Sequence, residues 1–232
     1  MSKPQPIRTV LFDLDGTLAD TAPDLAFALN QVLIEQGHEP LPFETIRPVV
    51  SNGGVALTRL GFDIDPEHPD FPPLYQRLLD IYRANIARET TLFPGMAELL
   101  DSIEQNDMNW GVVTNKPAWL TGPLMAALGL SERAACIVSG DTCANRKPHP
   151  ESILHGCQLA GSKAAQCVYI GDAQRDIEAG NRAGMKTIVA LFGYIGANDA
   201  PHDWQADVLL NSPKDIADWI AENCADEPAN NV

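Results

Sequence analysis

Two carboxylates two residues apart, Asp13 and Asp15, directly follow an apolar run at residues 10–12. Alternation along an extended backbone points both side chains the same way, and Gly16 lets the chain turn sharply beside them. Neighbouring acids repel each other when both are ionised, so a cation or a retained proton must relieve that repulsion. Such a motif on its own can also be a solvated turn, so its chemistry depends on which other groups the fold brings to it.

Two later segments carry side chains that suit phosphate binding. Thr114 and Asn115 follow the apolar pair at 112–113, and their hydroxyl and amide can hold phosphate oxygens, although a turn cap is the alternative. Lys147 lies in a loop that Pro148 and Pro150 stiffen just before a helical pattern. A lysine there is a compact charge that can neutralise a phosphate and a nearby carboxylate. An ordinary surface lysine is the alternative.

A second acidic pair, Asp172 and Asp176, follows the apolar run at 168–170 and Gly171. The spacing lets Asp172 reach a metal ion while Asp176 holds a metal-bound water or the lysine. Capping of a helix N-terminus by these acids is the alternative. Because carboxylate oxygens are hard ligands that suit magnesium, the two acidic pairs together predict Mg²⁺ as the cofactor.

These groups need a scaffold that brings separate strand ends together. Strands alternating with helices after residue 92 predict an α/β fold with a parallel sheet wrapped by helices. In such a sheet ligands bind at the carboxyl ends of the strands, which is where the candidate residues fall. Short apolar runs predict buried strands at 8–12, 110–113, 136–139, 167–170, 187–192 and 206–210.

Residues 19–92 break this alternation, because only helical patterns follow the first strand there. The segment Thr21 to Asp24 predicts a helix N-cap with Pro23 in the first turn, and Gly37 predicts the end of that helix. A second helical pattern spans 74–86. The sequence therefore predicts a helical subdomain inserted between the first strand and the rest of the sheet.

Composition narrows the class of partners. A chain of 232 residues that is 45% apolar can bury a large core, and its net charge of −15 argues against nucleic acid or an anionic membrane as partner. A local cation can still bind a phosphate ester, since salt screens the net charge beyond about 8 Å. No apolar run is long enough to span a bilayer or resembles a signal peptide, so we expect a cytoplasmic protein.

Taken together, the motifs resemble the haloacid dehalogenase superfamily of phosphatases. The resemblance spans residues 8 to about 192 and implies a Rossmann-like core, residues 1–18 and 93–232, with an all-helical cap domain at 19–92. We expect this cap to close over the substrate about hinges near 19–21 and 92–95. The resemblance rests on four stretches: Phe12 to Leu18, Thr114, Lys147, and Gly171-Asp172 with Asp176.

The resemblance also implies a role for each residue of the motifs. Asp13 is the nucleophile that forms an aspartyl phosphate, and Asp15 is the general acid and then the general base. Thr114 and Lys147 hold the phosphate, while Asp13, the backbone carbonyl of Asp15 and Asp172 hold Mg²⁺. An alkoxide leaving group needs a proton, which Asp15 can supply, so its presence favours a phosphatase over a dehalogenase.

Two kinds of phosphatase share these features. The segments at 113–117 and 147–150 are similar to phosphoglycolate phosphatases, whereas those at 110–112, 192–195 and 204–216 look closer to N-acetylmuramic acid 6-phosphate phosphatases. Both substrates carry a carboxylate besides the phosphate, which calls for a second cation from the cap. The candidates are Arg47 and Arg59, which flank a flexible loop containing Asn52 and Gly53, although both arginines could be solvated surface residues.

Two other functions remain open at this point. A phosphosugar mutase of the same superfamily would keep the aspartyl phosphate long enough to return it to the sugar. A non-catalytic signalling domain would use the phosphoaspartate as its output, but such domains need neither a cap nor the proton donor Asp15. The sequence is compatible with a monomer or a homodimer, and it assigns no role to the acidic tail at 224–232.

Overall fold

Six parallel strands form one sheet in the order β5-β4-β1-β6-β7-β8 in the computed structural model, which describes residues 6–224. Strand β1 lies between β4 and β6, so the residues that follow these three strands meet at one edge of the sheet. This confirms the predicted α/β fold with a parallel sheet. The strands are β1 (Thr9–Phe12), β4 (Asn109–Val113), β5 (Cys136–Val138), β6 (Cys167–Gly171), β7 (Lys186–Ala190) and β8 (Val208–Leu210).

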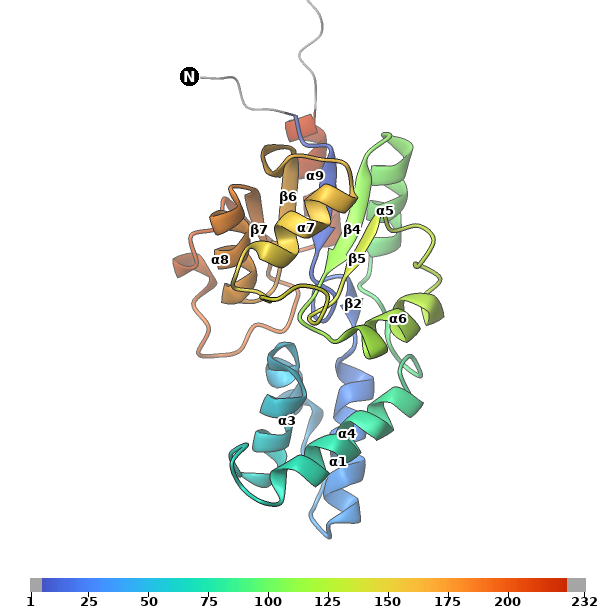
Figure 1. The fold of residues 1–232 in the computed structure, drawn as a ribbon, viewed down its shortest axis with the longest axis vertical. Helices are drawn as coiled ribbons and strands as arrows, with labels where there is room; N and C mark the ends of the chain where they lie inside the picture. The colour runs from blue at the N-terminus through green and yellow to red at the C-terminus, as the bar shows by residue number, and fades with distance from the viewer. Residues whose placement is uncertain (1–5, 225–232) are drawn as a thin grey trace, which may run out of the picture.

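Helices cover both faces of this sheet (Figure 1). Val10 and Phe12 of β1 pack into the cluster on one face, and Leu11 packs into the cluster on the other. Strands buried on both faces therefore appear as continuous apolar runs in the sequence. The helices of the first face are α5 (Met96–Gln105), α6 (Ala118–Ala127) and α9 (Pro213–Cys224); those of the second are α7 (Glu151–Leu159) and α8 (Gln174–Ala183).

The remaining helices form a second lobe, drawn below the sheet in Figure 1. Helices α1, α3 and α4 pack against one another around buried leucines that include Leu29, Leu57 and Leu78. We propose that residues 19–92 form the cap domain and that residues 1–18 and 93–232 form the core. The elements of this lobe are α1 (Ala22–Glu35), α2 (Phe43–Ile46), the 3-10 helix η1 (Arg47–Asn52), α3 (Gly53–Phe62) and α4 (Phe71–Ala84).

The two chain segments that join the lobes pair with each other. Strands β2 (Ala19–Asp20) and β3 (Thr91–Leu92) form an antiparallel ribbon at the predicted hinge positions. The expectation that residues 19–92 contain only helices was therefore wrong at both ends of the segment. Two-residue strands are too short to leave the alternating pattern by which a strand is recognised in a sequence.

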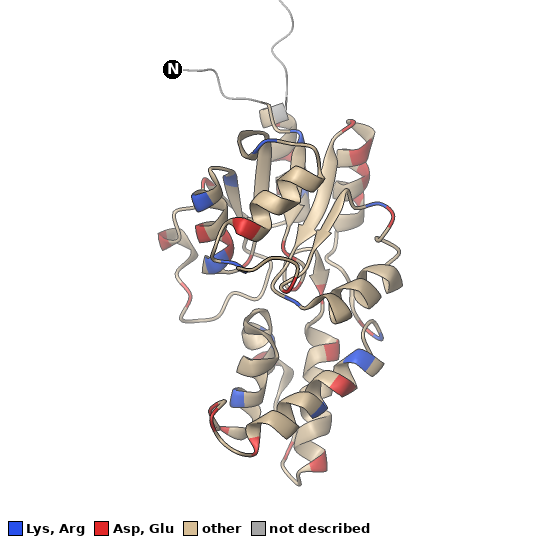
Figure 2. Cartoon of the chain, viewed as in Figure 1, with Lys and Arg blue, Asp and Glu red and all other residues tan. Residues whose placement is uncertain are grey.

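Most charged residues lie on the helices and loops, including the loops that face the helical lobe (Figure 2); in the strands of the described residues they are Asp20 in β2 and Lys186 in β7. Within the described residues, no helix combines the length and the apolar character needed to span a bilayer. Except for the backbone of Cys224, the predicted acidic tail lies outside the described residues.

Candidate active site

A cavity of about 890 Å³ lies between the carboxyl ends of the strands and the helical lobe. The helical lobe contributes residues 50–55, where η1 meets α3, and aromatic residues of α4, and the sheet lobe contributes most of the predicted site. The structure therefore brings together segments that are more than a hundred residues apart in sequence. The predicted residues that line the cavity are Asp13, Asp15, Asn52, Gly53, Thr114, Asn115 and Lys147.

Asp13 is a buried carboxylate that the structure keeps ionised. Burial opposes its charge, but the positive charges of Lys147 and Arg175, with hydrogen bonds from Lys147 and the backbone of Leu14, lower its pKa. The Leu14 N–H donates to Oδ1 at 2.7 Å, and Lys147 Nζ lies 3.0 Å from the same oxygen. An ionised carboxylate is the nucleophilic form.

Lys147 is completely buried, and its ammonium has three partners. Nζ lies 3.0 Å from Asp13 Oδ1 and 2.7 Å from Asp176 Oδ1, and it donates to the Tyr169 hydroxyl at 2.7 Å. The backbone of Lys147 is held by Asn115, whose Nδ2 donates to the carbonyl at 2.9 Å and whose Oδ1 accepts from the N–H at 3.0 Å. The side-chain amide of Asn115 is therefore hydrogen-bonded to the backbone of Lys147. We propose that Asn115 positions this lysine and does not itself bind the phosphate.

The second acidic pair lies beside Asp13, and ligand oxygens of Asp13, Asp172 and Asp176 all fall within 4.8 Å of one another. Asp176 Oδ2 also accepts from the Ala173 N–H at 3.0 Å. Asp176 therefore both caps the N-terminus of α8 and contacts Lys147. Gly16 makes the close approach possible, because at its φ of +82° an added Cβ would lie 2.1 Å from Asp172 Oδ2.

Lys147 pairs with two of these three buried carboxylates, Asp13 and Asp176, and no ion pair within residues 6–224 involves Asp172. Burial, followed by the charges of Asp176 and Asp13, raises the pKa of Asp172 to about 7. A divalent cation would relieve this repulsion, and the donors are all carboxylate oxygens, as hard cations require. The residues present therefore fit a divalent metal ion.

Asp15 has a lysine of its own, Lys116, which sequence reasoning missed as a site residue. Lys116 Nζ donates to Asp15 Oδ1 at 2.8 Å, and Thr21 Oγ1 donates to the same oxygen at 2.7 Å. Thr21 is the N-cap residue of α1 with Pro23 in the first turn, as predicted, but its side chain makes no cap hydrogen bond and bonds Asp15 instead. Burial opposes the charge of Lys116, but Asp15 and Tyr82 raise its pKa above the ordinary value.

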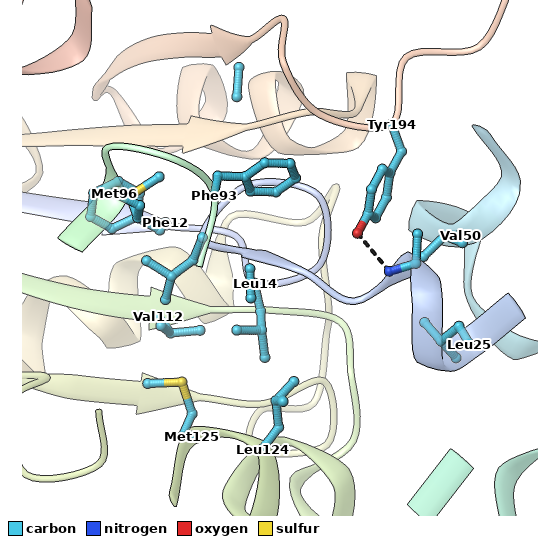
Figure 3. Close-up of a cluster of buried hydrophobic side chains, with 14 of the residues drawn as sticks. Phe12, Leu14, Leu25, Val50, Phe93, Met96, Val112, Leu124, Met125 and Tyr194 are labelled. Atoms are coloured by element: carbon cyan, nitrogen blue, oxygen red, sulfur yellow. Dashed lines mark hydrogen bonds between the residues drawn. The ribbon is translucent and has the colours of Figure 1, made fainter. Parts of the chain in front are cut away.

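The two arginines expected to bind a substrate carboxylate do not line the cavity. Arg59 is 57% exposed and pairs with Asp65 at 2.7 Å. Arg47 donates to the carbonyl oxygens of residues 192 and 193 at 3.3 and 3.2 Å, and its guanidinium lies 4.9 Å from the centroid of the Tyr194 ring. Tyr194 in turn accepts a hydrogen bond from the first residue of α1 (Figure 3). Arg47 therefore stabilises the junction between the lobes.

Arg175 is a second cavity residue that was missed, although it lies between Asp172 and Asp176 in the sequence. Its guanidinium donates to the carbonyl of Ser51 at 2.6 Å and to Asn52 Oδ1 at 3.4 Å. The Ser51 hydroxyl donates to Asp172 Oδ2 at 2.6 Å. The end of η1 in the helical lobe therefore contacts the acidic cluster directly.

Comparison with known proteins defines the class. The family described as haloacid dehalogenase-like hydrolase matches residues 10–190, and the chain belongs to this family. This confirms the resemblance that the motifs suggested. It agrees with the parallel sheet and with the cluster of acids at its edge.

Individual relatives are similar over nearly the whole chain. N-acetylmuramic acid 6-phosphate phosphatase of Pseudomonas putida is 41% identical over 210 residues, which cover 90% of this chain and 94% of that protein. Phosphoglycolate phosphatase of Xanthomonas campestris pv. campestris is 42% identical over 212 residues, with the same coverage. The structure of a predicted phosphoglycolate phosphatase from Haemophilus somnus matches with a TM-score of 0.81 and 25% identity, covering 92% of this chain and 97% of that chain. These relatives confirm the predicted enzyme class, a phosphatase.

Proposed function

We propose that this protein is a Mg²⁺-dependent phosphomonoester hydrolase that forms an aspartyl phosphate on Asp13. Its substrate is a small phosphate ester that also carries a carboxylate, either 2-phosphoglycolate or N-acetylmuramic acid 6-phosphate. The observation that carries the proposal is the ionised Asp13, held 3.0 Å from a buried lysine in a cavity that Asp15 also lines. A cytoplasmic location and closure of the helical lobe over the substrate are parts of the same proposal.

In the first step a carboxylate oxygen of Asp13 attacks phosphorus, and the bond from phosphorus to the ester oxygen breaks. Asp15 gives a proton to the departing oxygen, so the product leaves as an alcohol. Lys116 and Thr21 both bond Oδ1 of Asp15, and no hydrogen bond within residues 6–224 involves Oδ2. Oδ2 is therefore the atom that carries this proton.

In the second step water attacks the phosphorus of the aspartyl phosphate, and Asp15 takes a proton from that water. The bond from phosphorus to the Asp13 oxygen breaks, inorganic phosphate leaves, and Asp13 is again a carboxylate. Asp15 ends protonated at Oδ2, as it began. The net reaction converts one ester and one water into one alcohol and one phosphate.

The remaining residues hold the phosphate and the metal ion. Asp13, Asp172 and the backbone carbonyl of Asp15 are the proposed ligands of Mg²⁺. The chemistry that the ion supplies when bound is neutralisation of charge on the phosphate oxygens. Thr114 Oγ1 accepts from the Lys116 N–H at 3.2 Å and lines the cavity, so its own proton is free to bond a phosphate oxygen.

Phosphate release tests the proposal directly. Purified protein is incubated with 2-phosphoglycolate or N-acetylmuramic acid 6-phosphate, with either Mg²⁺ or a chelator, and inorganic phosphate is measured. We expect release with Mg²⁺ only, loss of release in Asp13→Asn, and an acid-quenched phosphopeptide that contains Asp13. Asp141→Asn is the matched control, because Asp141 lines the same cavity but only accepts from the Ala118 N–H at 2.8 Å.

Two results would contradict this function. Undiminished turnover in Asp13→Asn would remove the nucleophile from the mechanism. Conversion of a sugar phosphate into its isomer without release of phosphate would identify a mutase.

A further inference from the structure

The cation nearest to the proposed proton donor is Lys116, and it lies on the leaving-group side of the site. Its ammonium is 2.8 Å from Asp15 Oδ1, whereas Lys147 holds Asp13 on the phosphate side. Since Asp15 protonates the departing oxygen, the atoms bonded to that oxygen lie next to Lys116. This position of the leaving group rests on the proposed function, in which Asp15 is the proton donor.

Lys116 is also placed to bind an anion. Its side chain is only 6% exposed yet lines the cavity, and its ammonium lies 4.5 Å from the centroid of the Tyr82 ring of the helical lobe. Within residues 6–224 one carboxyl group, that of Asp15, lies within ion-pair distance of its ammonium, whereas Lys147 lies between two. A desolvated ammonium has three N–H donors, so it can donate a hydrogen bond to a second carboxylate at short range.

The other cations near the cavity suit this role less well. Arg47 and Arg59 do not line the cavity, and the Arg175 guanidinium already donates a hydrogen bond to the carbonyl of Ser51. Arg146 lines the cavity but is exposed, so solvent screens its charge. Lys116 is therefore the buried cation at the place where a substrate's second anionic group would lie.

We propose that Lys116 is a specificity-determining residue that binds a carboxylate attached to the carbon next to the ester oxygen. This defines the preferred substrates as phosphate esters of 2-hydroxy acids, of which 2-phosphoglycolate is the smallest. In N-acetylmuramic acid 6-phosphate the carboxylate is attached through C3 of the ring, many bonds from the ester oxygen. That carboxylate does not reach Lys116 while the phosphate lies on Asp13.

The test compares two pairs of esters in matched variants. The first pair is 2-phosphoglycolate and its carboxamide, 2-phosphoglycolamide, which keeps the shape and removes the charge. The second pair is N-acetylmuramic acid 6-phosphate and N-acetylglucosamine 6-phosphate, which differ in the lactyl group that carries the distant carboxylate. The ratio of kcat/KM within each pair cancels any general damage to Asp15, which affects both esters alike.

We expect Lys116→Met to lower the glycolate-to-glycolamide ratio about 10- to 100-fold, as for loss of one hydrogen bond to a charged group. Lys116→Arg should retain most of the preference, and the sugar ratio should not change. Arg146→Met is the matched control and should leave both ratios unchanged. Lys116→Gln replaces the methionine variant if that variant does not fold.

Binding gives a readout that does not depend on turnover. In Asp13→Asn, calorimetry should show tighter binding of 2-phosphoglycolate than of the carboxamide, and adding Lys116→Met should abolish that difference. An unchanged glycolate ratio with an equal loss for both esters would show that Lys116 only positions Asp15, and would overturn the proposal. A change confined to the sugar ratio would overturn it as well. Absence of phosphate release by the wild type would instead overturn the proposed function, and the binding experiment would still test Lys116.

Discussion

Removing the ammonium of Lys147 should destabilise the protein far more than removing an exposed lysine with an equally short ion pair. In Lys147→Met the carboxylates of Asp13 and Asp176 lose a partner with a completely buried side chain, at 3.0 and 2.7 Å. Breaking a buried pair in this way leaves an uncompensated charge and costs about 3–5 kcal/mol. Lys214→Met is the control, because Lys214 lies 2.7 Å from Asp218 but is 80% exposed. Solvent screens an exposed helix pair of this kind, so its loss should change the free energy of unfolding very little.

The free energy of unfolding lost in Lys147→Met should depend on pH, because the carboxyl groups of Asp13 and Asp176 then lack their cationic partner. Without Lys147 the folded protein holds one of them protonated, so its folded pKa lies above the ordinary value of 3.8. A raised carboxyl pKa lowers stability as the pH rises above that ordinary value, by about 1.4 kcal/mol for each pH unit. The cost of Lys147→Met should therefore grow from about 2 kcal/mol at pH 5 to about 5 kcal/mol at pH 7.

Urea unfolding in the presence of a chelator measures both effects. The free energy of unfolding of the wild type, Lys147→Met and Lys214→Met is determined at pH 5 and at pH 7, with the chelator excluding bound metal. Equal losses for the two methionine variants, or a loss in Lys147→Met that does not depend on pH, would refute the reasoning about burial and charge.

Three further outcomes follow from the site. Asp15→Asn should lower kcat about 10²–10⁴-fold for alkyl phosphates but much less for p-nitrophenyl phosphate, whose leaving group needs no proton; an equal loss for both would contradict the role of a proton donor. Gly16→Ala places a Cβ 2.1 Å from Asp172 Oδ2, so Mg²⁺ affinity measured by calorimetry should fall, and unchanged affinity would argue against Asp172 as a ligand. Burial raises the pKa of Tyr82 to about 12, so the neutral phenol stabilises the fold less as the pH rises past about 10. Between pH 9 and 11 the wild type should therefore lose about 1 kcal/mol more than Tyr82→Phe in urea unfolding, and parallel pH profiles would contradict this.

The positions of the acids could be predicted because they depend on topology. Asp13, Thr114 and Asp172 each follow a run of consecutive apolar residues, and such runs are the strongest signal that a buried parallel strand leaves in a sequence. Once the strands are parallel and neighbouring, their carboxyl ends must converge. Lys147 reaches Asp13 at 3.0 Å from the loop between β5 and α7, nine residues beyond the end of β5, so strand order alone does not determine this contact.

Contacts that depend on side-chain direction between distant segments could not be predicted. Lys116 and Asp15 are 101 residues apart, and no local pattern distinguishes a lysine that reaches across a sheet edge from one that is solvated. The same holds for Thr21, whose hydroxyl has two local uses, a helix cap and a contact with Asp15. Arg47 illustrates the opposite error, because its charge suggested a substrate contact while its guanidinium bonds backbone carbonyls between the lobes.

The contacts between the lobes tie the helical lobe to the charges of the site. Thr21 donates to Asp15 at 2.7 Å, and Ser51 donates to Asp172 at 2.6 Å, so the helical lobe supplies hydrogen bonds to two acids of the sheet lobe. Separating the lobes would leave these carboxylates without those donors, and a buried acceptor left unsatisfied costs about 1–3 kcal/mol. A cation or water that enters the opened site could replace the lost hydrogen bonds. The position of the helical lobe and the electrostatics of the acidic cluster are therefore coupled. The carboxylate oxygens of Asp15 and Asp172 would bond the helical lobe when the lobes are together and a cation or water when they are apart.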